Sequence, residues 1–281
     1  MRRINYIEPI IMLATVVQWL VLAIITGAIV GTGTSVFLGS LFFSTGKTAS
    51  IPLWMQMLLL PAGGLLNGLL LYYGYRSNKS GLKDSVIAAV HKQSGKMPFK
   101  TLLIKPIAAI ITLACGGSAG KEGPCSHIGG TLASGLGRVL GLNSELRKRI
   151  VACGVSAGFA SVFGTPIAGA IYGVEVLAVG RIQPSFLFPA IIAGVTSFEV
   201  SKFWGIPYKY YNMEYMGSLP QFSEIVFIKT IIIGIFCGVA AWVFVDLIRL
   251  VRAGFSRLRE RFGIWPPFMP LLGGLLLSAL I

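Results

Sequence analysis

The sequence predicts an all-α protein that crosses a membrane several times, on the strength of its composition, its apolar stretches and the placement of its charges. Of 281 residues, 54% are hydrophobic and only 12% are charged, whereas soluble domains carry about 25% charged residues. A spanning helix needs roughly 20 apolar residues. Four stretches meet that length: 10–43, 51–74, 185–203 and 223–248. We therefore expect one polytopic transmembrane domain over 1–281.

The positive charge is distributed as in a membrane protein. A net charge of +14 would also suit a nucleic-acid-binding protein, but here the basic residues gather at the edges of the apolar stretches. The clusters are Arg2–Arg3, Arg76 to Lys100, Arg138 to Arg149 and Arg249 to Arg261. Cytoplasmic loops carry this excess of Lys and Arg. We expect a cytoplasmic N-terminus, the plasma membrane of a prokaryote, a lipid bilayer around the chain and no nucleic-acid partner.

The same clusters order the crossings. The stretch 10–43 runs outward and 51–74 returns, because the clusters on either side of the pair both lie inside. The remaining segments are a short hairpin of 101–117 and 123–140, a second of 150–163 and 166–178, an outward span at 184–203, an inward span at 223–250 and the start of a further helix at 267–281. The basic segment from Arg138 to Arg149 is expected as an inner connection.

Two of these helices are interrupted at membrane depth. The first break is the Gly-rich run 116–124, GGSAGKEGP, and the second is Gly164-Thr165-Pro166. Freed backbone groups cost several kcal/mol each in hydrocarbon, so such breaks are tolerated only inside protein or beside a wet cavity. Interrupted, re-entrant helices are the best sequence indication of a transport site.

The first break has the features of an anion site. Gly120, Lys121 and Gly123 precede or open a helix whose first turn accommodates Pro124, and free amides at a helix N-terminus bind anions. Glu122 is an acidic residue at membrane depth, which by default marks function. Its carboxylate is a tethered anion that can occupy the site, leave on protonation and so serve as both gate and proton carrier. The alternative is a helix cap in which Glu122 pairs with Lys121.

Three other polar residues near the apolar segments each have two possible roles. Ser80, with Gly81 after it, is either an ordinary N-cap or a hydroxyl donor to the anion. Lys105, 17 residues before Glu122, either raises the positive potential of the site or extends to the inner interface. Glu175 is either an inner proton or salt-bridge group or an interfacial polar end.

Neither the cysteines nor the histidines predict a metal site or a cofactor. Cys115, Cys125, Cys153 and Cys237 lie in apolar or Gly-rich segments without paired spacing, so we expect them to be small buried side chains. His91 and His127 lack a second ligand at metal-binding spacing, and we expect both to be structural.

Several of these residues resemble the CLC family of chloride channels and chloride/proton exchangers. The run 120–124, GKEGP, is similar to the family's G-K/R-E-G-P motif, and 80–82, SGL, to the middle of its G-S-G-I-P motif. The stretch 153–175 is similar to the next helix pair, and Lys105 falls where many members carry Lys. The resemblance implies a homodimer of two-repeat subunits, with the first inverted half at 1–203 and the start of the second at 204–281. It implies Glu122 as gate and Ser80 as an anion contact.

The chain also departs from the family's pattern. Lys79 and Lys83 replace Gly and Pro of the first motif, and Val176 stands where exchangers often carry an inner glutamate. No G-x-F-x-P, a motif of the family's second half, occurs, so we expect a truncated or split chain. A fluoride-exporting branch usually replaces the serine matching Ser80, so its presence favours chloride.

The resulting expectation is transmembrane transport of chloride or other small anions, with protons as a second substrate if the protein is an antiporter rather than a channel. Fluoride export and a non-conducting fragment that needs its missing half are the alternatives. An enzyme is not expected, because the sequence has no zinc motif, no Ser/His/Asp set and no paired carboxylates in one segment.

Overall fold

The computed structural model describes residues 7–75, 86–178, 184–208 and 224–280, and these residues form helices and loops with no strand among them. The helices in chain order are α1 (Ile7–Ala49), α2 (Leu53–Tyr75), α3 (Val86–Lys92), α4 (Thr101–Ala114), α5 (Glu122–Val139), α6 (Ser144–Phe163), α7 (Pro166–Ala178), α8 (Pro184–Phe203), α9 (Glu224–Phe262) and α10 (Phe268–Leu280). The predicted all-α class is confirmed.

Four helices have the length and composition of membrane spans. They cover Ile11–Ala49, Leu53–Tyr75, Ser185–Phe203 and Glu224–Phe262, the same four places that hydropathy predicts. Both predicted interruptions are present. α4 ends at Ala114 before α5 begins, and α6 ends at Phe163, followed by Gly164, whose φ of 68° is left-handed. The two short hairpins of the sequence analysis are therefore α4–α5 and α6–α7.

Three predicted helix boundaries are wrong. α1 continues to Ala49 instead of 43, and α9 continues to Phe262 instead of ending near Arg249. The added segment of α9 contains strong helix formers such as Arg, Leu and Glu, and the helix stops only before Gly263, with φ of 59°. Charge marks where a helix leaves the membrane, but it does not end the helix.

The third wrong boundary is the start of α6. It begins at Ser144, six residues before the expected 150, so part of the predicted inner connection is helical. Asn143 is the N-cap, and its side chain accepts a hydrogen bond from the backbone N–H of Leu146 at 2.9 Å. Glu145 in the first turn pairs with Lys148 at 2.8 Å. This capping arrangement stabilises a helix start within the basic cluster.

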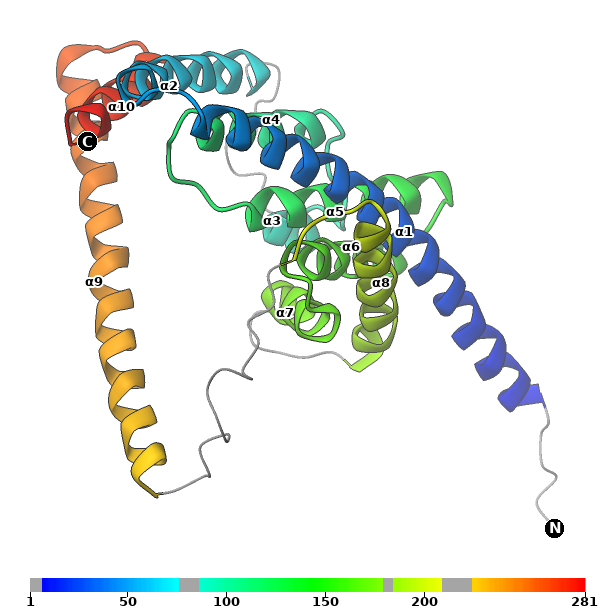
Figure 1. Ribbon diagram of the computed structural model, residues 1–281. Coiled ribbons are helices and arrows are strands. Elements are labelled where there is room, and N and C mark those ends of the chain that lie inside the picture. The colour runs from blue at the N-terminus through cyan, green and yellow to red at the C-terminus, as the bar shows by residue number, and fades with distance from the viewer. Residues whose placement is uncertain (1–6, 76–85, 179–183, 209–223, 281) are drawn as a thin grey trace.

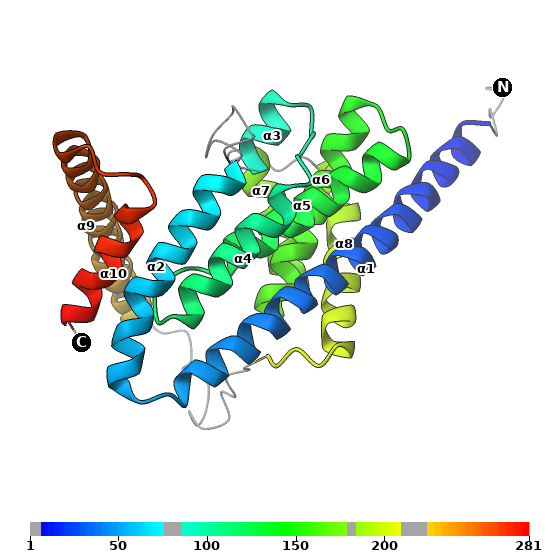
Figure 2. The ribbon, with the colours of Figure 1, turned by 90° about the horizontal axis from the view of Figure 1, so that it is seen from above.

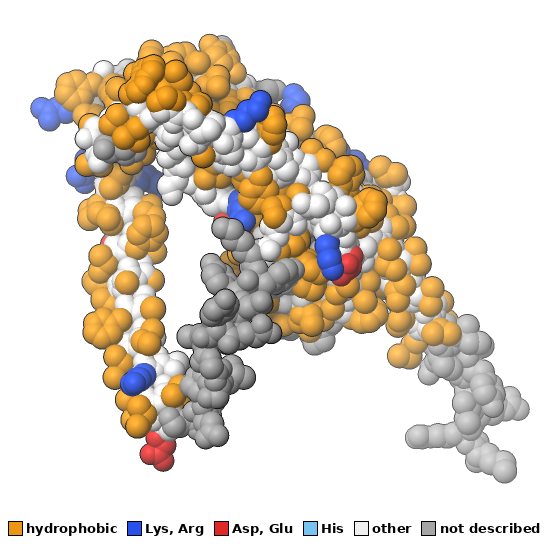
Figure 3. All heavy atoms as spheres, in the orientation of Figure 1, with side chains coloured by type: hydrophobic (Ala, Val, Ile, Leu, Met, Phe, Trp, Pro, Cys, Tyr) orange, Lys and Arg blue, Asp and Glu red, His pale blue; other side chains and the backbone are white. Residues whose placement is uncertain are grey.

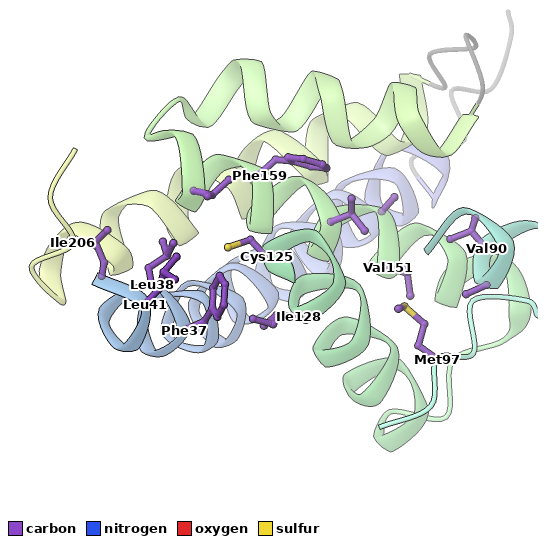
Figure 4. Close-up of a cluster of buried hydrophobic side chains, with 14 residues drawn as sticks. Phe37, Leu38, Leu41, Val90, Met97, Cys125, Ile128, Val151, Phe159 and Ile206 are labelled. Carbon is purple, nitrogen blue, oxygen red and sulfur yellow. The ribbon is translucent and has the colours of Figure 1, made fainter. Parts of the chain in front are cut away.

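The core is built around α5 and α6. Every residue of α6 from Ile150 to Val162 is buried. Gly129 of α5 contacts Gly154 of α6 backbone to backbone, and the absence of a side chain at Gly158 leaves room for the carbonyl of Cys125. Figure 4 shows side chains of α1, α5 and α6 pointing into one apolar cluster, which includes Phe37, Leu38, Leu41, Cys125, Ile128 and Phe159.

The C-terminal helices lie at the edge of this bundle. α10 packs along α2 (Figure 2), where Gly64 and Gly68 meet the backbone of α10 and the turn before it. α9 extends away from the bundle (Figure 1), has no buried residue, and displays hydrophobic side chains along its length (Figure 3). Cys237 on α9 is therefore exposed and Cys115 is half-buried, contrary to the prediction for all four cysteines, whereas Cys125 and Cys153 are buried.

Candidate anion site

The loop between α4 and α5 presents its backbone to open space. Gly116 adopts φ of 87°, a conformation that glycine alone takes readily, and this reverses the chain after α4. Ser118, Ala119 and Gly120 are exposed. The loop thus leads directly into the first turn of α5 without a covering element from the described part of the chain.

The start of α5 has no side-chain cap. Lys121 stands at the N-cap position with helical φ and ψ of −82° and −15°, and its side chain makes no capping hydrogen bond. Intrahelical bonding begins where the N–H of Cys125 donates to the carbonyl of Lys121 at 3.3 Å. The earlier amides of the turn therefore lack helical partners, and the positive end of the helix dipole favours an anion there.

The Glu122 carboxylate folds back over this loop. The side chain is half-buried, and a Cβ at Gly120 would lie only 2.5 Å from Glu122 Oε2. A Cβ at Gly123, by contrast, would meet nothing within 4 Å. The carboxylate thus lies beside the glycine backbone that precedes the helix, and the space in front of Gly123 is open.

Lys121 does not neutralise Glu122. Its ammonium lies 5.6 Å from the ring centroid of Phe42 on α1, which directs it away toward that helix. The ion pairs formed within the described part of the chain are Lys148–Glu145 and Arg249–Asp246. The alternative in which Lys121 and Glu122 form a paired cap is therefore not what this structure contains.

Lys105 lies against α5 and contacts a residue that sequence reasoning treated as isolated. The Nζ of Lys105, half-buried on α4, is 3.4 Å from Nδ1 of His127 on α5. Nε2 of His127 is 2.8 Å from the hydroxyl of Thr101, and His127 is only 2% exposed. The sequence contained one signal of this contact, the predicted α4–α5 hairpin, because an antiparallel pair of helices brings residues on either side of its turn together.

The remaining predicted site residues are less connected. Ser80 and Gly81 lie outside the described residues, so the structure does not place them. Glu175 is exposed near the end of α7 and belongs to no ion pair within the described part of the chain, which favours the interfacial alternative. The structure thus brings Gly120, Lys121, Glu122 and Gly123 together, with Lys105 on the neighbouring helix.

Comparison of the sequence with known proteins matches a family of chloride channels and individual chloride channel proteins. A family model described as voltage-gated chloride channel matches residues 63–281. A chloride/fluoride channel protein of Pseudomonas syringae pv. tomato is 31% identical over 98% of this chain. The chloride channel protein CLC-f of Arabidopsis thaliana is 29% identical over 79% of it.

Two solved structures are similar in fold. A CLC-type fluoride/proton antiporter matches 99% of the chain with a TM-score of 0.77 and 26% identity. A slow cyanobacterial Cl⁻/H⁺ antiporter matches 93% with a TM-score of 0.71 and 24% identity. The chain covers 66% of the first antiporter and 58% of the Pseudomonas relative, so it spans only part of the length of these proteins.

Proposed function

The chain belongs to the voltage-gated chloride channel family, also called CLC, and from this membership we propose that it moves chloride across a membrane under the control of Glu122. As a family member it is a multi-pass integral membrane protein. The proposal places it in the plasma membrane with a cytoplasmic N-terminus, as a homodimer. Residues 1–203 form the first inverted half and 204–281 open the second.

The single observation that carries the proposal is the position of the Glu122 carboxylate. It lies over the loop glycines at an uncapped helix start, where the helix dipole attracts negative charge. A free anion and the carboxylate compete for the same amides. Protonation removes the charge of the carboxylate and therefore its attraction to the helix N-terminus. The side chain can then leave, and the site opens to the anion. Whether proton movement accompanies each anion, as in an antiporter, depends on a second proton path.

Lys105 contributes to the same site at longer range. His127, which its ammonium contacts, is five residues after Glu122, or about 7.5 Å along the helix axis. Two opposite unit charges about 10 Å apart attract by roughly 1.7 kcal/mol at an effective dielectric constant of 20. This attraction acts on the carboxylate and on the free anion alike, so Lys105 raises occupancy of the site without choosing between them.

The direct test is Glu122→Gln, which keeps the size of the side chain and removes its charge. We expect anion efflux from liposomes to lose its pH dependence and to remain at the level that the unsubstituted protein reaches in acid. Glu145→Gln is the matched control, because Glu145 is also an acid in a first helical turn but is exposed and paired with Lys148. Unchanged pH dependence in Glu122→Gln would refute the gate.

The assay follows chloride and protons together, on the 281-residue chain. Opposed proton movement indicates an antiporter, and chloride flux alone indicates a channel, which Val176 in place of an inner glutamate would favour. No flux of either ion would support the alternative that the 281-residue chain by itself is non-conducting.

Fluoride export is the second candidate, because both a chloride/fluoride channel protein and a fluoride/proton antiporter are among the similar proteins. The retention of Ser80 is the reason to prefer chloride. Efflux of fluoride and of chloride from the same liposome preparation distinguishes the two. A fluoride rate well above the chloride rate would replace the chloride assignment and leave the role of Glu122 intact.

A further inference from the structure

A chain of three hydrogen bonds crosses the α4–α5 interface. Lys105 Nζ approaches His127 Nδ1 at 3.4 Å, His127 Nε2 approaches the Thr101 hydroxyl at 2.8 Å, and that hydroxyl donates to the carbonyl of Pro98 at 2.7 Å. His127 and Thr101 are 2% and 1% exposed. A buried arrangement of this kind is costly unless every polar group is satisfied.

The chemistry of the groups fixes the direction of each bond. An ammonium can only donate, so Nδ1 of His127 accepts from Lys105. The neutral ring then carries its proton on Nε2 and donates to Thr101, whose own hydrogen is used on Pro98. A doubly protonated ring would turn a second N–H toward the ammonium. The contacts therefore select a neutral His127 of one tautomer beside a charged Lys105.

This chain of bonds lies close to the anion site. His127 is in the second turn of α5, and helical side chains lean toward the N-terminus of their helix, here toward Glu122. Lys105 has a flexible four-carbon side chain whose ammonium could otherwise move toward water. The contact with His127 Nδ1 thus holds the ammonium against α5.

We propose that His127 is a positioning residue, which acts by holding the Lys105 ammonium beside the start of α5 and so strengthens the binding of anions there. The inference rests on the proposed function, because it assigns His127 a role in the same site. His127 does not touch the anion, so its effect passes entirely through Lys105. Any side chain that both accepts from the ammonium and donates to Thr101 can replace it.

The test measures chloride and fluoride binding to the purified protein by calorimetry in a Glu122→Gln background, which has no carboxylate to compete with the anion and is the unsubstituted reference for this test. The variants are His127→Leu, His127→Gln, Lys105→Met and the double variant His127→Leu/Lys105→Met. The glutamine offers an acceptor oxygen and a donor nitrogen, so we expect affinity within about twofold of the unsubstituted protein. For His127→Leu and Lys105→Met we expect affinity about tenfold lower, the scale of a charge acting at this range. His91→Leu, at an exposed position on α3, is the matched control.

The double variant separates positioning from a merely structural role. If His127 acts through Lys105, the double variant binds no more weakly than Lys105→Met alone. Losses that multiply in the double variant, or unaltered affinity in His127→Leu, would overturn the inference while the proposed function stands. No binding by the unsubstituted protein would overturn both, and so identifies the proposed function as the step that failed.

Two further measurements apply if His127→Leu does not fold. Thr101→Val keeps the shape of the side chain and removes the hydroxyl that accepts from Nε2–H and donates to the carbonyl of Pro98. We expect it to lower affinity by a smaller factor than Lys105→Met. Nitrogen NMR of the His127 ring in the unsubstituted protein is expected to give the neutral Nε2–H tautomer at pH 7. The other tautomer or a charged ring contradicts the bonding described here, whatever the transport assay gives.

Discussion

The Glu122 carboxylate lies directly against the backbone of Gly120, at the place that a side chain of residue 120 would occupy. A Cβ at residue 120 would lie 2.5 Å from Glu122 Oε2, closer than carbon and oxygen approach without displacement. Glycine at this position thus has a function beyond turning the chain, because it leaves room for the acidic side chain to fold back over the amides of its own helix.

Gly120→Ala is therefore expected to displace the carboxylate and to weaken the pH dependence of anion efflux, in the same direction as Glu122→Gln. The neighbouring Gly123→Ala is the matched control, since its Cβ meets nothing within 4 Å and should leave the pH dependence in place. Efflux from liposomes between pH 5 and pH 8 is the measurement. Equal pH profiles for the two variants would mean that Glu122 does not use the space at Gly120.

Sequence reasoning located Glu122 because a carboxylate among glycines at membrane depth is unusual by its type alone. It did not connect Lys105 with His127, because each is unremarkable in its own segment and their contact depends on the rotation of two helices about their axes. The break between α4 and α5 was predictable, but the register of the pair was set by packing. Local sequence patterns thus identify residues whose burial in a membrane segment is energetically unfavourable. Contacts between residues of different helices can be identified only from the three-dimensional structure.

At the scale of the helices, α5 and α6 come into close backbone contact at a point where both carry glycine. Gly129 and Gly154 contact each other through their backbones, and a Cβ at Gly154 would lie 2.5 Å from Cβ of Ala133. Small residues permit such close packing in membranes, where van der Waals contact replaces the hydrophobic driving force. This crossing supports the first turns of α5, which carry Glu122 and His127.

Gly154→Ala is expected to destabilise the protein by about 1–3 kcal/mol, the usual cost of adding a methyl group to a packed core. Gly238→Ala on α9 is the matched control, because nothing lies within 4 Å of its Cβ and alanine is the better helix former. Thermal unfolding in detergent compares the two, with a lower transition temperature expected only for Gly154→Ala. A control that loses as much as Gly154→Ala would show that α9 is also closely packed.

The boundaries of the elements were less predictable than their existence. Hydropathy placed α1, α2, α8 and α9, but it reports where apolar residues end, and helices continue beyond that point. Asn143 and Gly263 determine the start of α6 and the end of α9 through capping and left-handed φ. Both signals are present in the sequence, and charge clusters outweighed them in the prediction.

The chain as a whole has two polar ends whose charges differ. The connection between α1 and α2 follows a single basic residue in the last turn of α1, Lys47. The connection between α5 and α6 is flanked by Arg138, Arg147, Lys148 and Arg149. Figure 2 shows these two connections at opposite ends of the bundle. From the excess of positive charge we expect the α5–α6 end to face the cytoplasm.

This orientation can be tested with two exposed positions, Ser50 after α1 and Leu140 after α5, in a variant whose four cysteines are replaced by serine or alanine. We expect Ser50→Cys to react with a membrane-impermeant maleimide in intact cells, and Leu140→Cys to react only after permeabilisation. Each position is the control for the other, because both variants share one background and one reagent. The reverse labelling pattern would place the N-terminus outside, and the helix start at Glu122 would then have to be assigned to the opposite half of the membrane.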